Sequence, residues 1–199
     1  IALLQQMSGV NAIAVYGKNT LSEALEGDTV LVGISTLGLF IASVGASILT
    51  IKLMNLKGRK FLIQLGTFVC TLCLGAVSLA FYLRGDKNYQ DSKPESVVII
   101  IGMCIFMAFF GLTLGPIVWL YIPEIVEPNI IPFSTMTNLV GASICIIVFP
   151  IIKSSKYIPF LFFFAWGLIS LFLNQKIMVE TRNKTRKTVF EEYRAKKLC

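Results

Sequence analysis

The sequence has no histidine and few charged side chains, and each shortage excludes a class of protein. Its 199 residues are 15% charged and 55% hydrophobic, with a mean hydropathy of +0.76. A soluble domain of this length carries far more charge. Without histidine, and without a credible cluster of other ligands, we expect no metal site and no cofactor. The composition therefore indicates a polytopic membrane protein.

Cysteine and net charge give weaker indications. The spacing Cys70-x-x-Cys73 occurs in redox motifs, but inside an apolar run we interpret it as packing. The net charge of +7 lies mostly at one end of the chain. It therefore indicates membrane topology rather than binding to nucleic acid.

Six apolar segments divide the chain, each close to the roughly 20 residues that cross a bilayer as a helix. They cover approximately residues 1–24, 29–54, 61–83, 97–123, 131–152 and 158–177. We expect an all-α membrane protein with six transmembrane helices in residues 1–177 and a basic tail in residues 178–199. The first segment begins at Ile1 without an initiator methionine, so we expect a fragment of a longer protein.

Lysine and arginine are distributed unevenly between the two ends of these segments. With six spans both chain ends lie on one side, and that side carries 12 of the 18 cationic residues. The opposite side carries Lys18, Arg84, Lys87, Lys93, Lys153 and Lys156. Because cytoplasmic loops are enriched in such residues, we expect a multi-pass protein of the plasma membrane with a cytoplasmic tail. Contact of the tail with anionic lipid is an alternative use of the same charges.

Three carboxamide side chains, Gln5, Gln6 and Asn11, lie within seven residues of the first segment. On one continuous helix they can share a face. In lipid such groups are costly unless they face protein or a water-filled cavity. A carboxamide both donates and accepts hydrogen bonds, so the cluster suits a neutral polyol better than an ion. Bonding between helices is the alternative that the residues leave open.

The fourth segment contains a helix breaker, because Gly115-Pro116 precedes Trp119 by about one turn. A proline in a membrane helix frees a backbone carbonyl and kinks the helix. We therefore expect Gly115 and Pro116 to form a hinge, with static packing as the alternative.

Four motifs occur in order along the chain, and together they are more specific than any one of them. They are Gln5–Asn11 (QQMSGVN) with Tyr16, Gly58–Lys60 (GRK), Gly115–Trp119 (GPIVW) with Glu124, and Val179–Arg182 (VETR) with Thr188–Glu192 (TVFEE). In sequence and order they resemble the motifs QQxSGxN…Y, GR[RK], GPxxW…E and PETKG…TFEE. These belong to the C-terminal half of the sugar porters, the sugar transporter family of the major facilitator superfamily.

The resemblance implies two six-helix bundles with the substrate between them near the midplane. This chain would be the C-terminal bundle of a twelve-helix fold and would require the missing N-terminal bundle. By matched position, the resemblance implies sugar contacts for Gln5, Gln6, Asn11 and Trp119, and an outer closing aromatic at Tyr16. We expect Phe110 to line the same cavity.

A second group of motif residues lies at cytoplasmic helix ends: Arg59, Lys60, Glu124 and Glu180. Paired across two bundles, these charges would close the inner side of a carrier. Exposed pairs contribute only about 0–1 kcal/mol each, so a network is needed. Charge that merely sets the topology is the alternative.

The chain also departs from the family's pattern. Asn55 stands where an acidic residue usually precedes the GR[RK] motif, and Ile131 lies where an arginine usually follows Glu124. The asparagine–tryptophan pair of the eleventh helix corresponds to Gly141-Ala142 or nearby residues. We therefore expect a weaker inner gate.

These patterns predict a protein that is not an enzyme but transports a hexose, a glucose-like monosaccharide, by facilitative uniport or proton symport. Its expected partners are the sugar and membrane lipid. No carboxylate or lysine lies in the middle of a segment, which argues against an ionic substrate held by this chain. Alternatives are a transporter of another neutral polyol such as inositol, a sugar sensor that does not transport, and a decayed gene fragment.

Overall fold

Five of the six apolar segments form helices, or runs of helices, long enough to cross a membrane. They are α3 (Thr29–Lys57), α4 (Arg59–Arg84), α5–η1–α6 (Lys93–Phe109, Phe110–Leu114, Gly115–Ile125), η2–α7 (Pro128–Ile130, Ile131–Ile151) and α8 (Ile158–Ile177). Helices are expected here because each satisfies its backbone hydrogen bonds internally, as lipid requires. The all-α prediction is confirmed.

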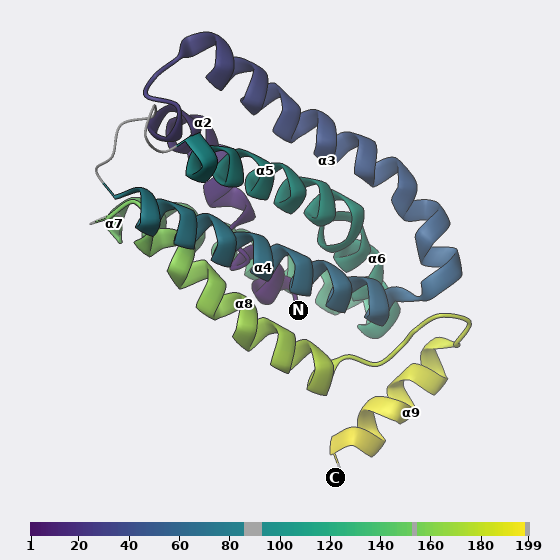
Figure 1. The fold of residues 1–199 in the computed structure, drawn as a ribbon. Coiled ribbons are helices and arrows are strands. Elements are labelled where there is room, and N and C mark those ends of the chain that lie inside the picture. The colour runs from purple at the N-terminus through teal and green to yellow at the C-terminus, as the bar shows by residue number, and fades with distance from the viewer. Residues whose placement is uncertain (86–92, 153–154, 198–199) are drawn as a thin grey trace.

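The computed structural model describes residues 1–85, 93–152 and 155–197. Lys87 and Lys153, which the charge count includes, lie outside the described residues, as does the end of the tail. Figure 1 shows α4 between α5 and α8, and these two neighbours make its most extensive contacts. Accordingly α4 is half buried over its apolar window, whereas α3 and α7 are only 17% buried. Helices α3 and α7 therefore have wide faces free for lipid or for another bundle.

The first segment differs from the prediction, because it is two helices rather than one. Helix α1 (Ala2–Gln6) ends before Met7, and α2 (Val10–Ala24) begins after Gly9. Gly9 has a φ of +88°, and a Cβ there would lie 2.9 Å from Cγ of the buried Phe163. Only glycine fits both the left-handed conformation and this close approach. The break separates Gln5 and Gln6 from Asn11, so the three amides do not share a face of one helix.

Arg84 also differs from the prediction, which ended the third apolar segment at residue 83 and left Arg84 outside it. It is the last residue of α4, and its side chain is 3% exposed. Its guanidinium donates to the carbonyl oxygen of Ala24 and to Ser96 Oγ, and lies 3.8 Å from a Glu26 carboxylate oxygen. A cation beside the carbonyl end of α2 is favourable. Arg84 therefore joins the ends of α2, α4 and α5.

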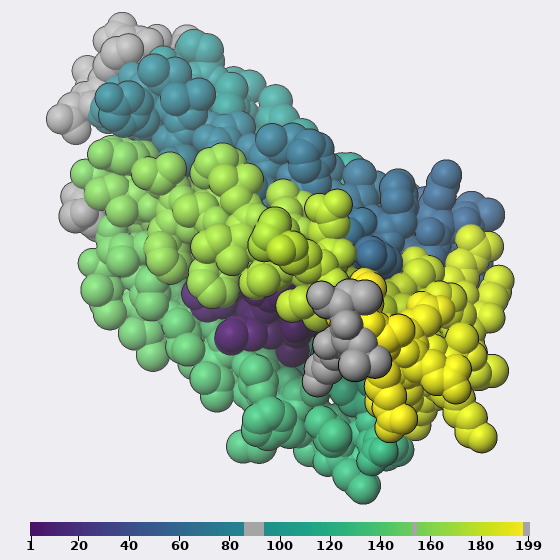
Figure 2. Space-filling view, turned by 90° about the horizontal axis from the view of Figure 1, so that it is seen from below, coloured from purple at the N-terminus to yellow at the C-terminus, as the bar shows by residue number. Residues whose placement is uncertain are grey.

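The tail turns back at one end of the bundle. After α8 the chain runs extended to α9 (Arg186–Lys197), which Figure 2 shows gathered in yellow beyond the end of α8. The hydroxyl of Tyr121, on α6, donates to the Val179 carbonyl at 2.7 Å and lies 2.8 Å from the hydroxyl of Tyr193, on α9. These contacts attach the tail to the C-terminal half of α6.

Candidate functional site

Most of the predicted substrate residues meet at one cleft of about 440 Å³. Its lining residues come from α1, α2, α3, η1 and α6: Gln5, Gln6, Val10, Asn11, Ser43, Ser47, Phe110, Gly111, Gly115, Pro116 and Trp119. The lining of the cleft thus combines amides and hydroxyls with aromatic rings. None of these lining residues carries a charge.

The amide groups of the cleft form a directed chain of hydrogen bonds. Asn11 Nδ2 donates to Gln6 Oε1, and Gln6 Nε2 donates to Asn138 Oδ1 at 2.7 Å. Asn138 Nδ2 donates to Gln5 Oε1 at 2.9 Å, and Gln5 Nε2 donates to the Leu114 carbonyl at 2.7 Å. Chains of this kind strengthen their members cooperatively in a low dielectric. This chain of hydrogen bonds runs from Asn11 at the cleft to Leu114, the last residue of η1.

The amides differ in how far they are open to the cleft. Gln5 is 3% exposed and uses both ends of its amide on protein partners. Gln6 and Asn11 are half-buried and line the open part of the cleft. In this conformation Gln5 therefore connects helices. Gln6 also uses both ends of its amide on protein partners, but it and Asn11 are partly exposed at the cleft, so their remaining donor and acceptor positions can face a ligand.

Asn138, on α7, is the residue that sequence reasoning missed. It is 2% exposed and bridges Gln5 and Gln6 across the bundle. The available signal was a carboxamide within the apolar run 131–152, the same signal that identified Gln5. The resemblance to the family instead matched the asparagine–tryptophan pair to Gly141-Ala142 or nearby residues. Gly141 lies three residues further along the same helix.

The break in the fourth segment is a π-helical turn, η1, followed by α6 with Pro116 in its first turn. Pro116 has no N–H, so it cannot donate to the Leu112 carbonyl, its partner in an α-helical register, or to the Gly111 carbonyl, its partner in a π-helical register. Thr50 Oγ1 donates to the Leu112 carbonyl at 2.8 Å, and Ser47 Oγ donates to the Gly111 carbonyl at 3.0 Å. Hydroxyls of α3 thus satisfy the carbonyls, as membrane helices with proline require.

The predicted aromatic residues separate into two groups. Trp119 is 44% exposed at the cleft, and Phe110 stacks on Phe106 with centroids 6.3 Å apart. Tyr16 does not line the cleft in this structure. Its ring stacks on Phe149 at 5.0 Å, and its hydroxyl donates to the Ile146 carbonyl at 3.3 Å. Tyr16 therefore packs on α7, and its role as a closing aromatic stays a prediction.

The predicted gate charges gather at the tail end of the bundle. Arg59 Nη2 lies 3.0 Å from Glu124 Oε1. Glu180 accepts hydrogen bonds from the backbone N–H groups of Arg59 at 2.9 Å and Lys60 at 3.1 Å. A carboxylate there stabilises the N-terminus of α4. These pairs lie within one chain, and pairing with a second bundle stays a prediction.

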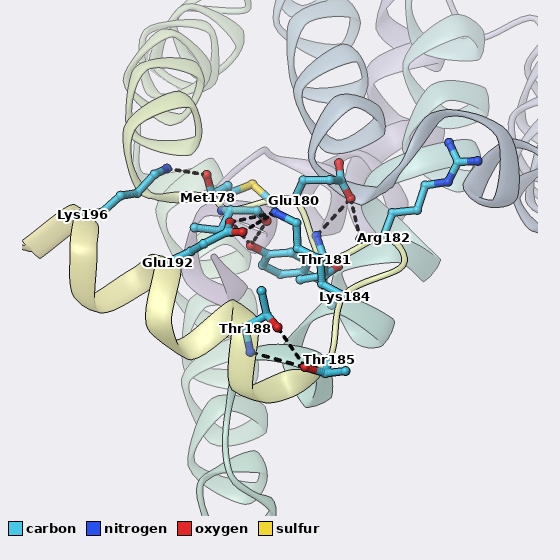
Figure 3. Close-up of polar contacts among 11 residues, drawn as sticks. Met178, Glu180, Thr181, Arg182, Lys184, Thr185, Thr188, Glu192 and Lys196 are labelled. Atoms are coloured by element: carbon cyan, nitrogen blue, oxygen red, sulfur yellow. Dashed lines mark hydrogen bonds and ion pairs between the residues drawn. The ribbon is translucent and has the colours of Figure 1, made fainter.

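Cations of the tail complement other helix ends, which sequence reasoning also missed. Figure 3 shows Lys196, on α9, reaching Met178, which directly follows α8. The donations to carbonyls are Arg182 to Leu56 (2.6 Å), Arg186 to Pro123 (2.6 Å) and Lys196 to Met178 (2.8 Å). These carbonyls lie at or beside the C-terminal ends of α3, α6 and α8, where positive charge is favourable.

Partial burial lowers the pKa of Lys196 from its ordinary value. The positive charge of Lys60 lowers this pKa further, and the carboxylate of Glu192 opposes the shift. Among the described residues, no group of three or more cysteine, aspartate or glutamate side chains could hold a metal ion. The chemistry of the described site is therefore that of neutral polar groups with charges at one end.

A known protein family and individual transporters are similar to nearly the whole of this chain. The family described as "Sugar (and other) transporter" matches residues 1–193. The D-xylose transporter of Levilactobacillus brevis is 24% identical over 203 residues, covering 98% of this chain and 43% of the relative. The glucose transporter GlcP of Staphylococcus epidermidis is 24% identical over 200 residues, covering 97% of this chain and 43% of the relative.

Solved structures share the fold. The major facilitator superfamily proton:xylose symporter XylE, bound to 6-bromo-6-deoxy-D-glucose, superposes with a TM-score of 0.82 at 17% identity. A partially occluded inward-open conformation of XylE from E. coli gives 0.75 at 20% identity. The chain covers 41% and 39% of those two chains, respectively. It thus has the fold of about two-fifths of a major facilitator transporter, and it spans less than half the length of the two relatives described above.

Proposed function

The chain belongs to the sugar transporter family, and we propose that the whole protein carries a hexose, a glucose-like monosaccharide, across a membrane by alternating access. In this proposal the chain forms one wall of the substrate site and a second six-helix bundle forms the other. The observation that carries it is the uncharged cleft in which Gln6, Asn11 and Trp119 meet. The relatives named as xylose and glucose transporters support a sugar as the substrate.

The chemistry of the cleft suits a neutral polyol. The amides of Gln6 and Asn11 can each donate to one hydroxyl and accept from its neighbour, while Trp119 offers an apolar face to the ring. Each such hydrogen bond contributes about 1 kcal/mol net of water. A few of them with stacking give roughly 4–5 kcal/mol, which corresponds to near-millimolar binding. Weak binding suits a carrier, since the sugar must also leave.

We assign the moving parts to the break in the fourth segment and to the charged end. The π-helical turn followed by Gly115 and Pro116 supports a hinge, because its carbonyls are satisfied by side chains rather than by its own helix. The Arg59–Glu124 pair and Glu180 would close the inner side together with the second bundle. The tail would then lie in the cytoplasm of a plasma-membrane protein, as the charge distribution predicts.

Uptake by the full-length protein tests the proposal. We expect Gln6→Ala and Asn11→Ala each to reduce uptake of radiolabelled glucose at least tenfold without loss of surface expression. Asn19→Ala is the matched control, because Asn19 is an exposed amide on the same helix as Asn11 but outside the cleft. Near-normal uptake by both cleft variants would reject the site. Competition by glucose, xylose and inositol identifies the substrate, and competition by inositol alone would reject the hexose.

A further inference from the structure

A second, smaller cavity is also lined by Gln5 but not by the open cleft residues Gln6 and Asn11. It amounts to about 10 Å³ of space for the centre of a water molecule. Helices α1, α4, α6 and α8 and the break after α1 contribute its lining, and its polar members are Gln5, Ser8, Thr67, Thr71, Ser170 and Asn174. By this measure, roughly 10–15 Å³ holds one water molecule.

Three polar atoms at this cavity are buried without a hydrogen-bond partner among the described residues. They are Ser8 Oγ, Ser170 Oγ and Asn174 Oδ1. Their residues are 8%, 3% and 3% exposed, respectively. Buried polar atoms are nearly always paired in folded proteins, so three at one small cavity indicate a common partner.

The neighbouring threonines do not supply that partner. Thr67 Oγ1 donates to the Ile63 carbonyl at 2.7 Å, and Thr71 Oγ1 donates to the Thr67 carbonyl at 2.7 Å. Both hydroxyl protons are therefore used within α4. Asn174 Nδ2 reaches Thr67 Oγ1 at 3.4 Å, which leaves its carbonyl oxygen as an acceptor.

The inventory of donors and acceptors fits a water molecule. Two hydroxyls can donate to the water oxygen, and the Asn174 oxygen can accept one water proton. Gln5 Oε1 accepts from Asn138 and, among the residues that the structure describes, from no other recorded donor, so it has a second lone pair for the other proton. A cation would meet only neutral oxygen atoms, since no lining residue is acidic, and an uncompensated charge is costly in such an interior.

We propose that Ser8, Ser170 and Asn174 form a binding site for a single structural water molecule. This water connects the break between α1 and α2 with α8, and through Gln5 it supports the amide chain of the cleft. Ser8 precedes Gly9, and α8 supplies both Phe163, which packs against Gly9, and the water ligands Ser170 and Asn174. The water and Phe163 therefore attach the helix break to the same helix. The site depends on the packing of this bundle and not on the identity of the transported solute.

A high-resolution structure of the full-length protein in potassium buffer, without sodium, tests the site directly. We expect one density peak in the cavity, with contacts of about 2.7–3.2 Å to Ser8, Ser170 and Asn174. An empty cavity would overturn the proposal. A peak that appears only after sodium is added would overturn it as well, since it would identify a cation.

Variants give an independent measurement by thermal unfolding in detergent. Asn174→Leu keeps the branched shape of the side chain but removes the acceptor and the Nδ2 donor to Thr67, and we expect it to abolish the density peak and lower Tm by about 2–8 °C. Ser170→Ala removes one of four bonds, so the peak remains and Tm falls less. Ser143→Ala is the control, because its exposed hydroxyl bonds only its own helix at Leu139. An unchanged Tm for Asn174→Leu would contradict the proposal, and the wild-type density decides it if that variant does not fold.

Discussion

The hydroxyl of Thr50 stabilises the break in the fourth segment through one hydrogen bond. Removing this hydroxyl should lower the free energy of unfolding by an amount that can be measured. Thr50 is 2% exposed, and its Oγ1 lies 2.8 Å from the Leu112 carbonyl oxygen. Thr50→Val keeps the shape of the side chain but deletes the donor. The carbonyl that Pro116 frees would then be buried without its partner.

A buried acceptor without a partner costs about 1–3 kcal/mol, and we expect Thr50→Val to lower the free energy of unfolding by this amount. Pro116→Ala supplies the missing N–H and lets Leu112 regain a helical donor. In that background Thr50→Val should cost at least 1 kcal/mol less, a coupling typical of residues in one hydrogen-bond network.

The measurement is a double-mutant cycle on the full-length protein, with unfolding followed by circular dichroism in mixed micelles. Thr36→Val is the matched control on the same helix, because Thr36 Oγ1 donates at 2.7 Å to the Val32 carbonyl of its own helix. That change should stay within about 0.5 kcal/mol. Strict additivity of Thr50→Val and Pro116→Ala would refute the reasoning, since it would mean that the hydroxyl does not serve the carbonyl freed by proline.

Two further predictions concern the gate and the approach of α3 to η1. Glu124→Gln removes the partner of Arg59 and should raise the occupancy of the inward-open state; unchanged labelling of inner-cavity cysteine probes would contradict this. A Cβ on Gly111 would lie 2.4 Å from the Ser43 carbonyl oxygen. Gly111→Ala should therefore lower the free energy of unfolding by about 1–3 kcal/mol. Gly33→Ala, where nothing in this chain lies within 4 Å, should not lower it in the same denaturation assay.

The helical segments and the family could be predicted from the sequence, because both depend on local patterns. An apolar run of about 20 residues has few alternatives to a helix in lipid. Four short motifs in the right order sufficed for the family, which the match over residues 1–193 confirms. The amides Gln5, Gln6 and Asn11 pointed to the cleft for the same reason, since polarity in an apolar run needs an explanation.

The hydrogen-bond partners of these residues could not be predicted, because they are distant in the chain. Asn138 bonds Gln5 and Gln6 across more than 130 residues, and Thr50 reaches Leu112 across 62. The sequence indicated that Pro116 frees a carbonyl, but not which hydroxyl would satisfy it. Likewise, no local pattern predicts that Arg84, just beyond the third apolar segment, joins three helix ends.

The sequence by itself determined that the chain is helical, membrane-embedded and related to sugar transporters, since hydropathy and motif order are properties of neighbouring residues. The tertiary structure decided where the first helix breaks, because Gly9 is compatible with either a helix or a turn until Phe163 packs against it. The same packing decided that Gln5 is buried between helices while Gln6 and Asn11 line the cleft. A hydrogen bond can be assigned only when both of its ends are in place, and folding alone brings those ends together.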